Sequence, residues 1–102
     1  MSIESVTVTR IYVSERDNLS EKIVQFLYDE SKVDGVTLLR GVEGFSEDSP
    51  TYPSFKADFS VDLPLIIEFY DKPERVEATI QSLTRRFPLR HIVSWTATSY
   101  KF

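Results

Sequence analysis

The strongest constraint on the fold is the order in which two kinds of sequence periodicity follow each other. Segments dense in β-branched and aromatic residues predict extended strands at 5–13, 36–42, 64–70 and 92–100. Apolar residues spaced three and four positions apart predict two amphipathic helices, at 19–32 and 73–87. This order of elements is that of a ferredoxin-like βαββαβ sandwich of the α+β class, in which two helices cover one face of an antiparallel sheet.

Each predicted helix begins at a capping pattern. Asn18 is followed three residues later by Glu21, and Asp71 is followed three residues later by Glu74, which is the spacing of a capping box. Pro73 falls in the first turn of the second helix, where proline is favoured. We therefore expect Asn18 and Asp71 to be the two N-cap residues.

The last two predicted strands carry apolar residues on both of their faces. In the third predicted strand Leu65, Ile67 and Phe69 point to one face, and Ile66 and Tyr70 point to the other. In the fourth, Val93 and Trp95 point to one face, and Ile92 and Tyr100 point to the other. A ferredoxin-like monomer leaves one sheet face bare, and soluble monomers rarely expose so large an apolar patch. We therefore expect the chain to form a homo-oligomer through its sheet.

Length and composition exclude several classes of protein. The chain has 102 residues, which predicts one domain over 1–102, and it has no cysteine and one histidine, His91. These counts exclude a disulfide framework, a thiolate zinc site and any site built on two imidazoles, so we predict no metal ligands and no catalytic residues. Without an apolar run near ~20 residues or a signal peptide, we expect a cytoplasmic protein that does not insert into membranes.

The negative charge of the chain belongs to one segment. The net charge is -4; segment 43–62 holds five acids and one lysine, while the other residues hold eleven of each sign. Pro50 and Pro53 also lie there, so we expect a long, flexible loop between the second and third strands. Its aromatic residues are unusual for a disordered segment and predict contact with a partner protein. The residues assigned to this contact are Glu47, Asp48, Tyr52, Phe55 and Phe59.

The densest local signal is the string RGVEGF at 40–45. Arg40 could hold a phosphate or carboxylate beside backbone amides that Gly41 and Gly44 leave accessible. Alternatively, the glycines permit a bend or bulge and Arg40 pairs with a nearby acid. The string lacks the lysine of a Walker motif, and Val42 stands where RNA-recognition domains carry a stacking aromatic. Because the adjacent acidic segment would also repel a phosphate backbone, we expect no nucleic-acid binding.

Two longer segments carry a family resemblance. GVTLLRGVEGF (Gly35 to Phe45) and SVDLPLIIEFYDKPERVEA (Ser60 to Ala78) resemble the PII-like proteins of the family named domain of unknown function 190. The strand through Arg10-Ile11-Tyr12 and the helix from Leu19 also fit. The resemblance implies a homotrimer with its sheets facing inward and a long loop that engages a target protein, like the T-loop of PII proteins.

The resemblance also implies a place for a ligand. In PII proteins small effectors, typically adenine nucleotides, bind in clefts between subunits near the base of the T-loop. By position, this cleft would be lined by Arg40, Gly41, Glu43, Gly44 and Phe45. However, Asp71-Lys72-Pro73 stands where PII proteins have a glycine-and-lysine phosphate loop. The sequence therefore leaves the identity of the effector open, with an adenine nucleotide as one candidate, and no cofactor is required.

Three functions remain open from the sequence. The favoured one is a trimeric signalling or regulatory protein, and the second is a structural oligomeric module without a ligand. The third is a small acylphosphatase-like enzyme, which has the same strand order but needs a phosphate-cradling loop after the first strand. There this chain has Ser14-Glu15-Arg16-Asp17, with two acids and no glycine, so we predict a protein that is not an enzyme.

Overall fold

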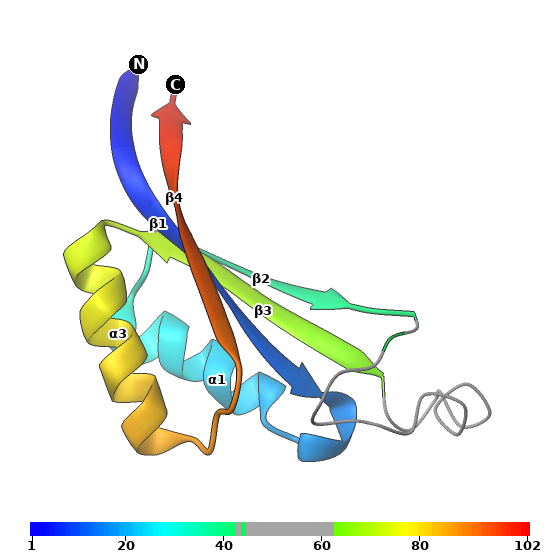
Figure 1. Ribbon diagram of the computed structural model, residues 1–102. Coiled ribbons are helices and arrows are strands. Elements are labelled where there is room, and N and C mark those ends of the chain that lie inside the picture. The colour runs from blue at the N-terminus through cyan, green and yellow to red at the C-terminus, as the bar shows by residue number, and fades with distance from the viewer. Residues whose placement is uncertain (43, 45–62) are drawn as a thin grey trace.

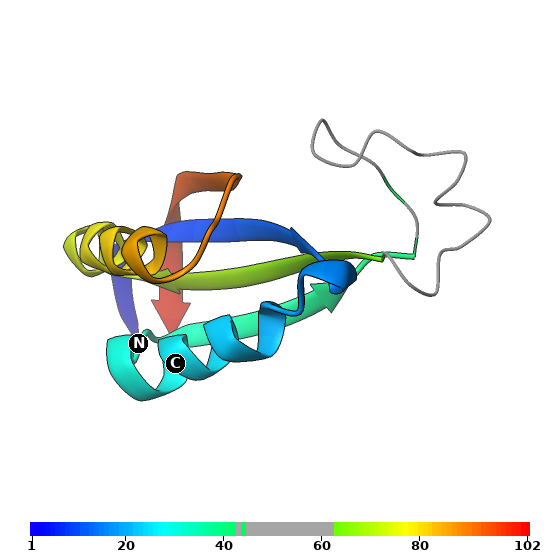
Figure 2. The same cartoon turned by 90° about the horizontal axis from the view of Figure 1, so that it is seen from below.

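The structure, a computed structural model, describes residues 1–42, 44 and 63–102. A four-stranded antiparallel sheet has the strand order β2-β3-β1-β4, and both helices lie against the same side of it (Figures 1 and 2). The elements are β1 (Ser2–Ser14), α1 (Ser20–Phe26), β2 (Gly35–Arg40), β3 (Pro64–Asp71), α3 (Pro73–Arg86) and β4 (Ile92–Lys101). The predicted ferredoxin-like α+β fold is confirmed, with β2 and β3 separated by a long connection.

The core lies between the sheet and the two helices. Alternate residues of β3 are buried, as the sequence predicted, and they pack against side chains of β1 and of both helices. Burying a large apolar side chain contributes roughly 1.5–3 kcal/mol, so this layer holds the helices on the sheet. The buried residues of this cluster are Ile11, Ile23, Phe26, Leu27, Ile67, Phe69, Val76 and Leu83.

The first strand is longer than the sequence predicted. Its segment Ser2–Val6 pairs with the end of β4, from Lys101 back to Ala97, whereas pairing with β3 begins only at Thr7. These two segments therefore form a two-stranded ribbon that projects beyond the part of the sheet covered by the helices (Figure 1). Residues 2–4 extend the strand because β4 provides a hydrogen-bonding partner. The composition of residues 2–4 does not reveal this pairing with a distant strand.

The start of α1 differs from the prediction. Residues Glu15–Asp17 form a short 3-10 turn, and Asn18 follows it in the left-handed region at φ 55°. Leu19, not Asn18, is the N-cap of α1. The prediction failed because Asn18 tolerates positive φ and separates the two helical pieces there. After α1 the helical segment continues through a π-helical turn, Leu27–Ser31, and Lys32 is its C-cap, close to the predicted end.

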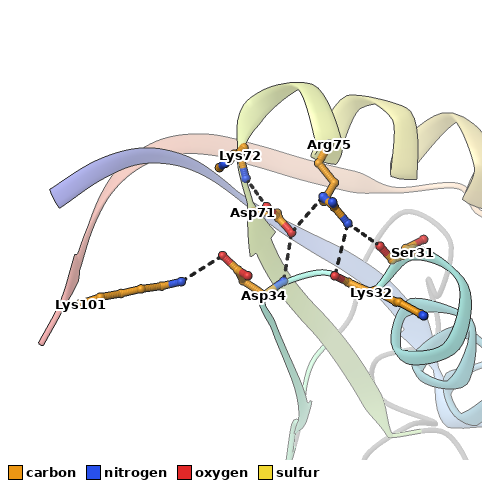
Figure 3. A network of polar contacts seen from close by, with 7 residues as sticks. All are labelled: Ser31, Lys32, Asp34, Asp71, Lys72, Arg75 and Lys101. Carbon is orange, nitrogen blue, oxygen red and sulfur yellow. Dashed lines mark hydrogen bonds and ion pairs between the residues drawn. The ribbon is translucent and has the colours of Figure 1, made fainter. Parts of the chain in front are cut away.

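The start of α3 differs by one residue. Asp71 closes β3, Lys72 is the N-cap and Pro73 is the first helical residue. The buried Asp71 carboxylate still serves this junction, since Oδ1 accepts a hydrogen bond from the Lys72 amide at 2.6 Å. Its Oδ2 accepts one from the Asp34 amide at 3.1 Å and lies 3.6 Å from Nε of Arg75 (Figure 3).

Among the described residues, no helix has the length and apolar character that a membrane span requires.

Candidate functional site

The end of β1, the end of β2 and the start of β3 meet at one corner of the sheet. Ser14 is directly opposite Pro64 in the β1–β3 register. The Glu15 amide donates a hydrogen bond to the Leu63 carbonyl at 2.8 Å, and the Gly41 amide donates one to the Pro64 carbonyl, also at 2.8 Å. Both ends of the connection between β2 and β3 are therefore fixed beside the turn that follows β1.

Arg40 is the cationic group at this corner. It is the last residue of β2, and its Nη1 donates a hydrogen bond to Oε2 of Glu15 in the 3-10 turn. Both side chains are partly exposed, and an exposed ion pair contributes only about 0.2–1 kcal/mol. The structure thus realises the alternative in which Arg40 pairs with a nearby acid, while an anion could replace Glu15 at little cost.

The two described glycines of the RGVEGF string have different surroundings. A Cβ at Gly41 would lie 2.7 Å from Cγ of Pro64 and 3.2 Å from its carbonyl oxygen. A Cβ at Gly44 would lie 3.5 Å from the same Cγ, which is ordinary van der Waals contact. Among the described glycines none has positive φ. Gly41 is therefore required by the close approach of β3, whereas sterics alone do not explain Gly44.

The other residues predicted for the ligand or the partner lie outside the described residues. The structure places Arg40, Gly41 and Gly44 together beside Pro64. The assignments of the other residues stay predictions. The predicted residues that fall outside are Glu43, Phe45, Glu47, Asp48, Tyr52, Phe55 and Phe59.

The start of α3 is a second place where an anion could bind, but a carboxylate of the protein already fills it. Asp71 accepts the Lys72 amide at this helix start and pairs with Arg75, whose Nη1 also donates to the Ser31 carbonyl at 3.0 Å (Figure 3). A phosphate placed here would meet a buried negative charge. The structure therefore agrees with the absence of a phosphate-loop sequence at this junction.

The sheet face away from the helices is apolar around its centre. Residues paired directly opposite each other share a face, so the register places one side chain from every strand on it. Tyr12, Leu39, Val93 and Trp95 on this face are between 38% and 43% exposed. The prediction that β3 and β4 carry apolar residues on both of their faces is confirmed. Ile66 on β3 and Val93 on β4 lie on the open face, on the side away from the residues that face the core. The apolar and aromatic side chains of this open face include Val8, Tyr12, Leu39, Ile66, Tyr70, Val93 and Trp95.

The centre of the open face holds an ion pair that the sequence analysis missed. Nε of Arg10 on β1 donates to Oε1 of Glu68 on β3 at 2.8 Å, and Cζ of Arg10 lies 5.6 Å from the centre of the Trp95 ring. The hydrogen bond to Glu68, followed by one to Tyr12, raises the pKa of Arg10. The sequence does contain a signal for this pair, because Arg10 and Glu68 each interrupt a row of alternating apolar residues in a central strand.

A shallow pocket of about 310 Å³ lies between α3 and the end of the first helical segment. Two of its charged residues are engaged within the chain, Glu30 with Arg86 at 3.2 Å and Arg75 with Asp71. Within the part of the chain that the structure describes, no cluster of three or more histidine, aspartate or glutamate residues could hold a metal ion. We therefore place the candidate site at the strand-end corner and on the open face.

Three solved structures have a similar fold at low sequence identity. CPII from Thiomonas intermedia K12, bound to ADP, AMP and acetate, is 14% identical with a TM-score of 0.64, over 97% of this chain and 90% of that chain. A putative PII-like signaling protein from Thermus thermophilus is 15% identical with a TM-score of 0.59, over 97% of this chain and 91% of that chain. These likenesses show that the fold is PII-like.

The third structure is an enzyme domain. LarC2, the C-terminal domain of a cyclometallase involved in the synthesis of the NPN cofactor of lactate racemase, is 6% identical with a TM-score of 0.62. The match covers 97% of this chain and 58% of that chain. The same fold thus occurs in proteins with different activities, and the fold alone does not assign one.

The family comparison covers nearly the whole described scaffold. The family described as "Uncharacterized ACR", domain of unknown function 190, matches residues 6–98. This range includes both segments on which the resemblance in the sequence rested, together with all four strands and both helices in whole or in part. With its PII-like fold, the chain belongs to the family of domain of unknown function 190.

Proposed function

We propose that this chain is the subunit of a PII-like regulatory homotrimer that binds a small effector at its subunit clefts. In this proposal the protein is cytoplasmic and not an enzyme, and a target protein contacts the segment between β2 and β3. The observation that carries the proposal is the open sheet face, an apolar surface in a chain whose PII-like fold spans 97% of its length.

Assembly through the open face is supported by what a single chain leaves exposed. The apolar side chains around Arg10 and Glu68 form a continuous surface over neighbouring strands, which an isolated soluble chain rarely exposes. The ribbon adds a second apolar surface, because Ile3 and Tyr100 are directly opposite each other and are 57% and 58% exposed. Copies of the chain packed around a common axis would cover these surfaces.

Effector binding is proposed at the strand-end corner, where Arg40 lies beside the Gly41 backbone. The weak pairing of Arg40 with Glu15 leaves its guanidinium available to a phosphate or carboxylate. Because the structurally similar CPII is described as bound to ADP and AMP, an adenine nucleotide is the effector we propose to test first. The start of α3 would not hold its phosphates, since Asp71 is already there.

A structural module without a ligand is the second candidate. It is favoured by the fact that both Gly41 and Arg40 have roles within the chain, Gly41 in its contact with Pro64 and Arg40 in its ion pair. Under this alternative the chain would assemble but retain no small molecule. The two candidates therefore differ in ligand content and agree on assembly.

A phosphate-transferring enzyme is disfavoured by the turn between β1 and α1. In that turn Asp17 Oδ2 accepts a hydrogen bond from the Ser14 amide at 3.1 Å. A carboxylate of the protein therefore occupies a backbone amide that a phosphate-cradling loop would leave for its ligand. This arrangement supports a regulatory protein over an acylphosphatase-like one.

Native mass spectrometry of the purified protein tests the proposal directly. We expect a complex of three subunits at micromolar concentration, and we expect added ADP or AMP to increase its mass by up to three ligands. Titration calorimetry with ADP and AMP would give the affinity. A stable monomer would contradict the assembly, and a trimer that binds neither nucleotide would leave the structural module as the better description.

A further inference from the structure

The polar pair at the centre of the open face needs an explanation. Arg10 and Glu68 are directly opposite each other on the two central strands; on the outer strands Val93 of β4 lies opposite Arg10 and Thr37 of β2 lies opposite Glu68. In the isolated chain their side chains are 35% and 29% exposed, so water still reaches both groups. If the face is covered by other subunits, this water is removed and the pair becomes buried.

Burial changes what such a pair does to stability. A partly exposed ion pair contributes at most about 1 kcal/mol. Removing two charges from water costs several kcal/mol per ion, and apolar residues in the same place often bind as well or better. The pair is therefore a poor source of affinity, but it penalises every packing arrangement that separates Arg10 from Glu68.

The geometry of the pair is fixed by more than one contact. Glu68 accepts Nε–H of Arg10 at 2.8 Å, and Trp95 lies under the guanidinium, with 5.6 Å between Cζ and the ring centre. Charged groups held in one position within an apolar interface can select register and subunit number, as polar residues do in coiled coils. A purely apolar face would accept several sliding arrangements of similar energy.

We propose that the Arg10–Glu68 pair sets the register and the number of subunits in an assembly whose interface is the open face of identical chains. This inference rests on the assembly proposed above. The partner is a further copy of this chain because the pair makes the centre of the face neutral, so identical faces meet without net repulsion. Strongly charged partners would gain little there, since the surrounding side chains are apolar.

The test uses the full chain and methionine, whose unbranched apolar side chain is close in length to that of Glu68 and to the aliphatic part of Arg10. In Arg10→Met or Glu68→Met one charge is left unpaired when the face is covered, so we expect the association constant to fall about 100-fold. In the double variant Arg10→Met/Glu68→Met no charge remains, so we expect association to recover with a mixture of subunit numbers. Light scattering and native mass spectrometry measure both quantities.

Matched controls separate the pair from general effects of charge removal. Glu30 and Arg86 form an ion pair at 3.2 Å on the helix side of the sheet, and Cζ of Arg86 lies 5.1 Å from the centre of the Phe26 ring. Because this pair resembles the first in chemistry but lies away from the open face, Glu30→Met/Arg86→Met should keep one subunit number. The swap Arg10→Glu/Glu68→Arg should restore a single species if its circular dichroism spectrum is native.

The outcomes distinguish the inference from the proposed assembly. Mixed subunit numbers in the double methionine variant alone would support the inference. A double variant with the single mass of the wild-type assembly would overturn it and leave the assembly intact. A wild-type chain that is monomeric at micromolar concentration would overturn both.

Discussion

Arg40, the last residue of β2, forms an ion pair with Glu15 in the turn that follows β1. The pair joins two strand ends that are separated by β3 in the sheet order. Since both side chains are partly exposed, the pair is weak and an anion could compete with Glu15. This competition makes the proposed effector site testable at single residues.

Replacing Arg40 should weaken effector binding, and releasing it should strengthen binding. We expect Arg40→Ala to raise the Kd for ADP or AMP at least about tenfold, the scale of one lost charged hydrogen bond. Glu15→Gln should lower the Kd a few fold because the guanidinium no longer has a competing carboxylate. Titration calorimetry at fixed ionic strength measures both. An equal loss in Arg85→Ala, a matched arginine on α3, would show that only net charge matters.

Asp71 should matter for stability much more than its neighbour Asp34. The buried Asp71 carboxylate links the start of β2, the end of β3 and α3, so we expect Asp71→Asn to destabilise the protein by about 2–3 kcal/mol. The Asp34 side chain pairs at 3.4 Å with Lys101 near the surface, so Asp34→Asn should cost less than about 1 kcal/mol. Urea unfolding at one protein concentration gives both values. Equal losses would argue against the linking role.

The elements that the sequence predicted well are those that carry their own periodicity. The alternation of Leu65, Ile67 and Phe69 and the helical spacing of α3 identify core-facing residues without knowledge of the partner strands. The N-caps were predicted less well, since Asn18 and Asp71 suit more than one local conformation. Asp71 accepts a hydrogen bond from the distant Asp34 amide, whereas the Asn18 amide donates locally to the Glu15 carbonyl, and local composition distinguishes neither arrangement from an N-cap.

The candidate site was harder to predict because its contacts are distant in sequence. Arg40 pairs with Glu15 across 25 positions, and Arg10 pairs with Glu68 across 58. The second pair depends on the register between β1 and β3, where a shift of one residue would place either charge on the core face. Arg40 could thus be chosen from its motif, whereas its partner could not.

The projecting ribbon should depend on neighbouring subunits. A two-stranded ribbon is at best marginally stable alone, and Ile3 opposite Tyr100 has little cover within the chain. If assembly covers it, amides of residues 2–6 and 97–101 should exchange with deuterium roughly tenfold faster when dilution dissociates the complex. Residues 7–14 pair with β3 as well and serve as the internal control. Exchange in the ribbon that is independent of concentration would contradict its role in assembly.

The two glycines beside Pro64 should respond differently to the same substitution, which separates a structural role from a ligand role. Gly41→Ala places a Cβ 2.7 Å from Cγ of Pro64, so the start of β3 must shift and we expect a loss of about 1–3 kcal/mol of stability. In Gly44→Ala the added Cβ lies 3.5 Å from the same atom, so the free energy of unfolding should stay within about 0.5 kcal/mol of wild type. If Gly44 lines the effector cleft, its alanine variant should keep the wild-type melting temperature while calorimetry shows weaker nucleotide binding. Unchanged binding in Gly44→Ala would remove this residue from the proposed cleft.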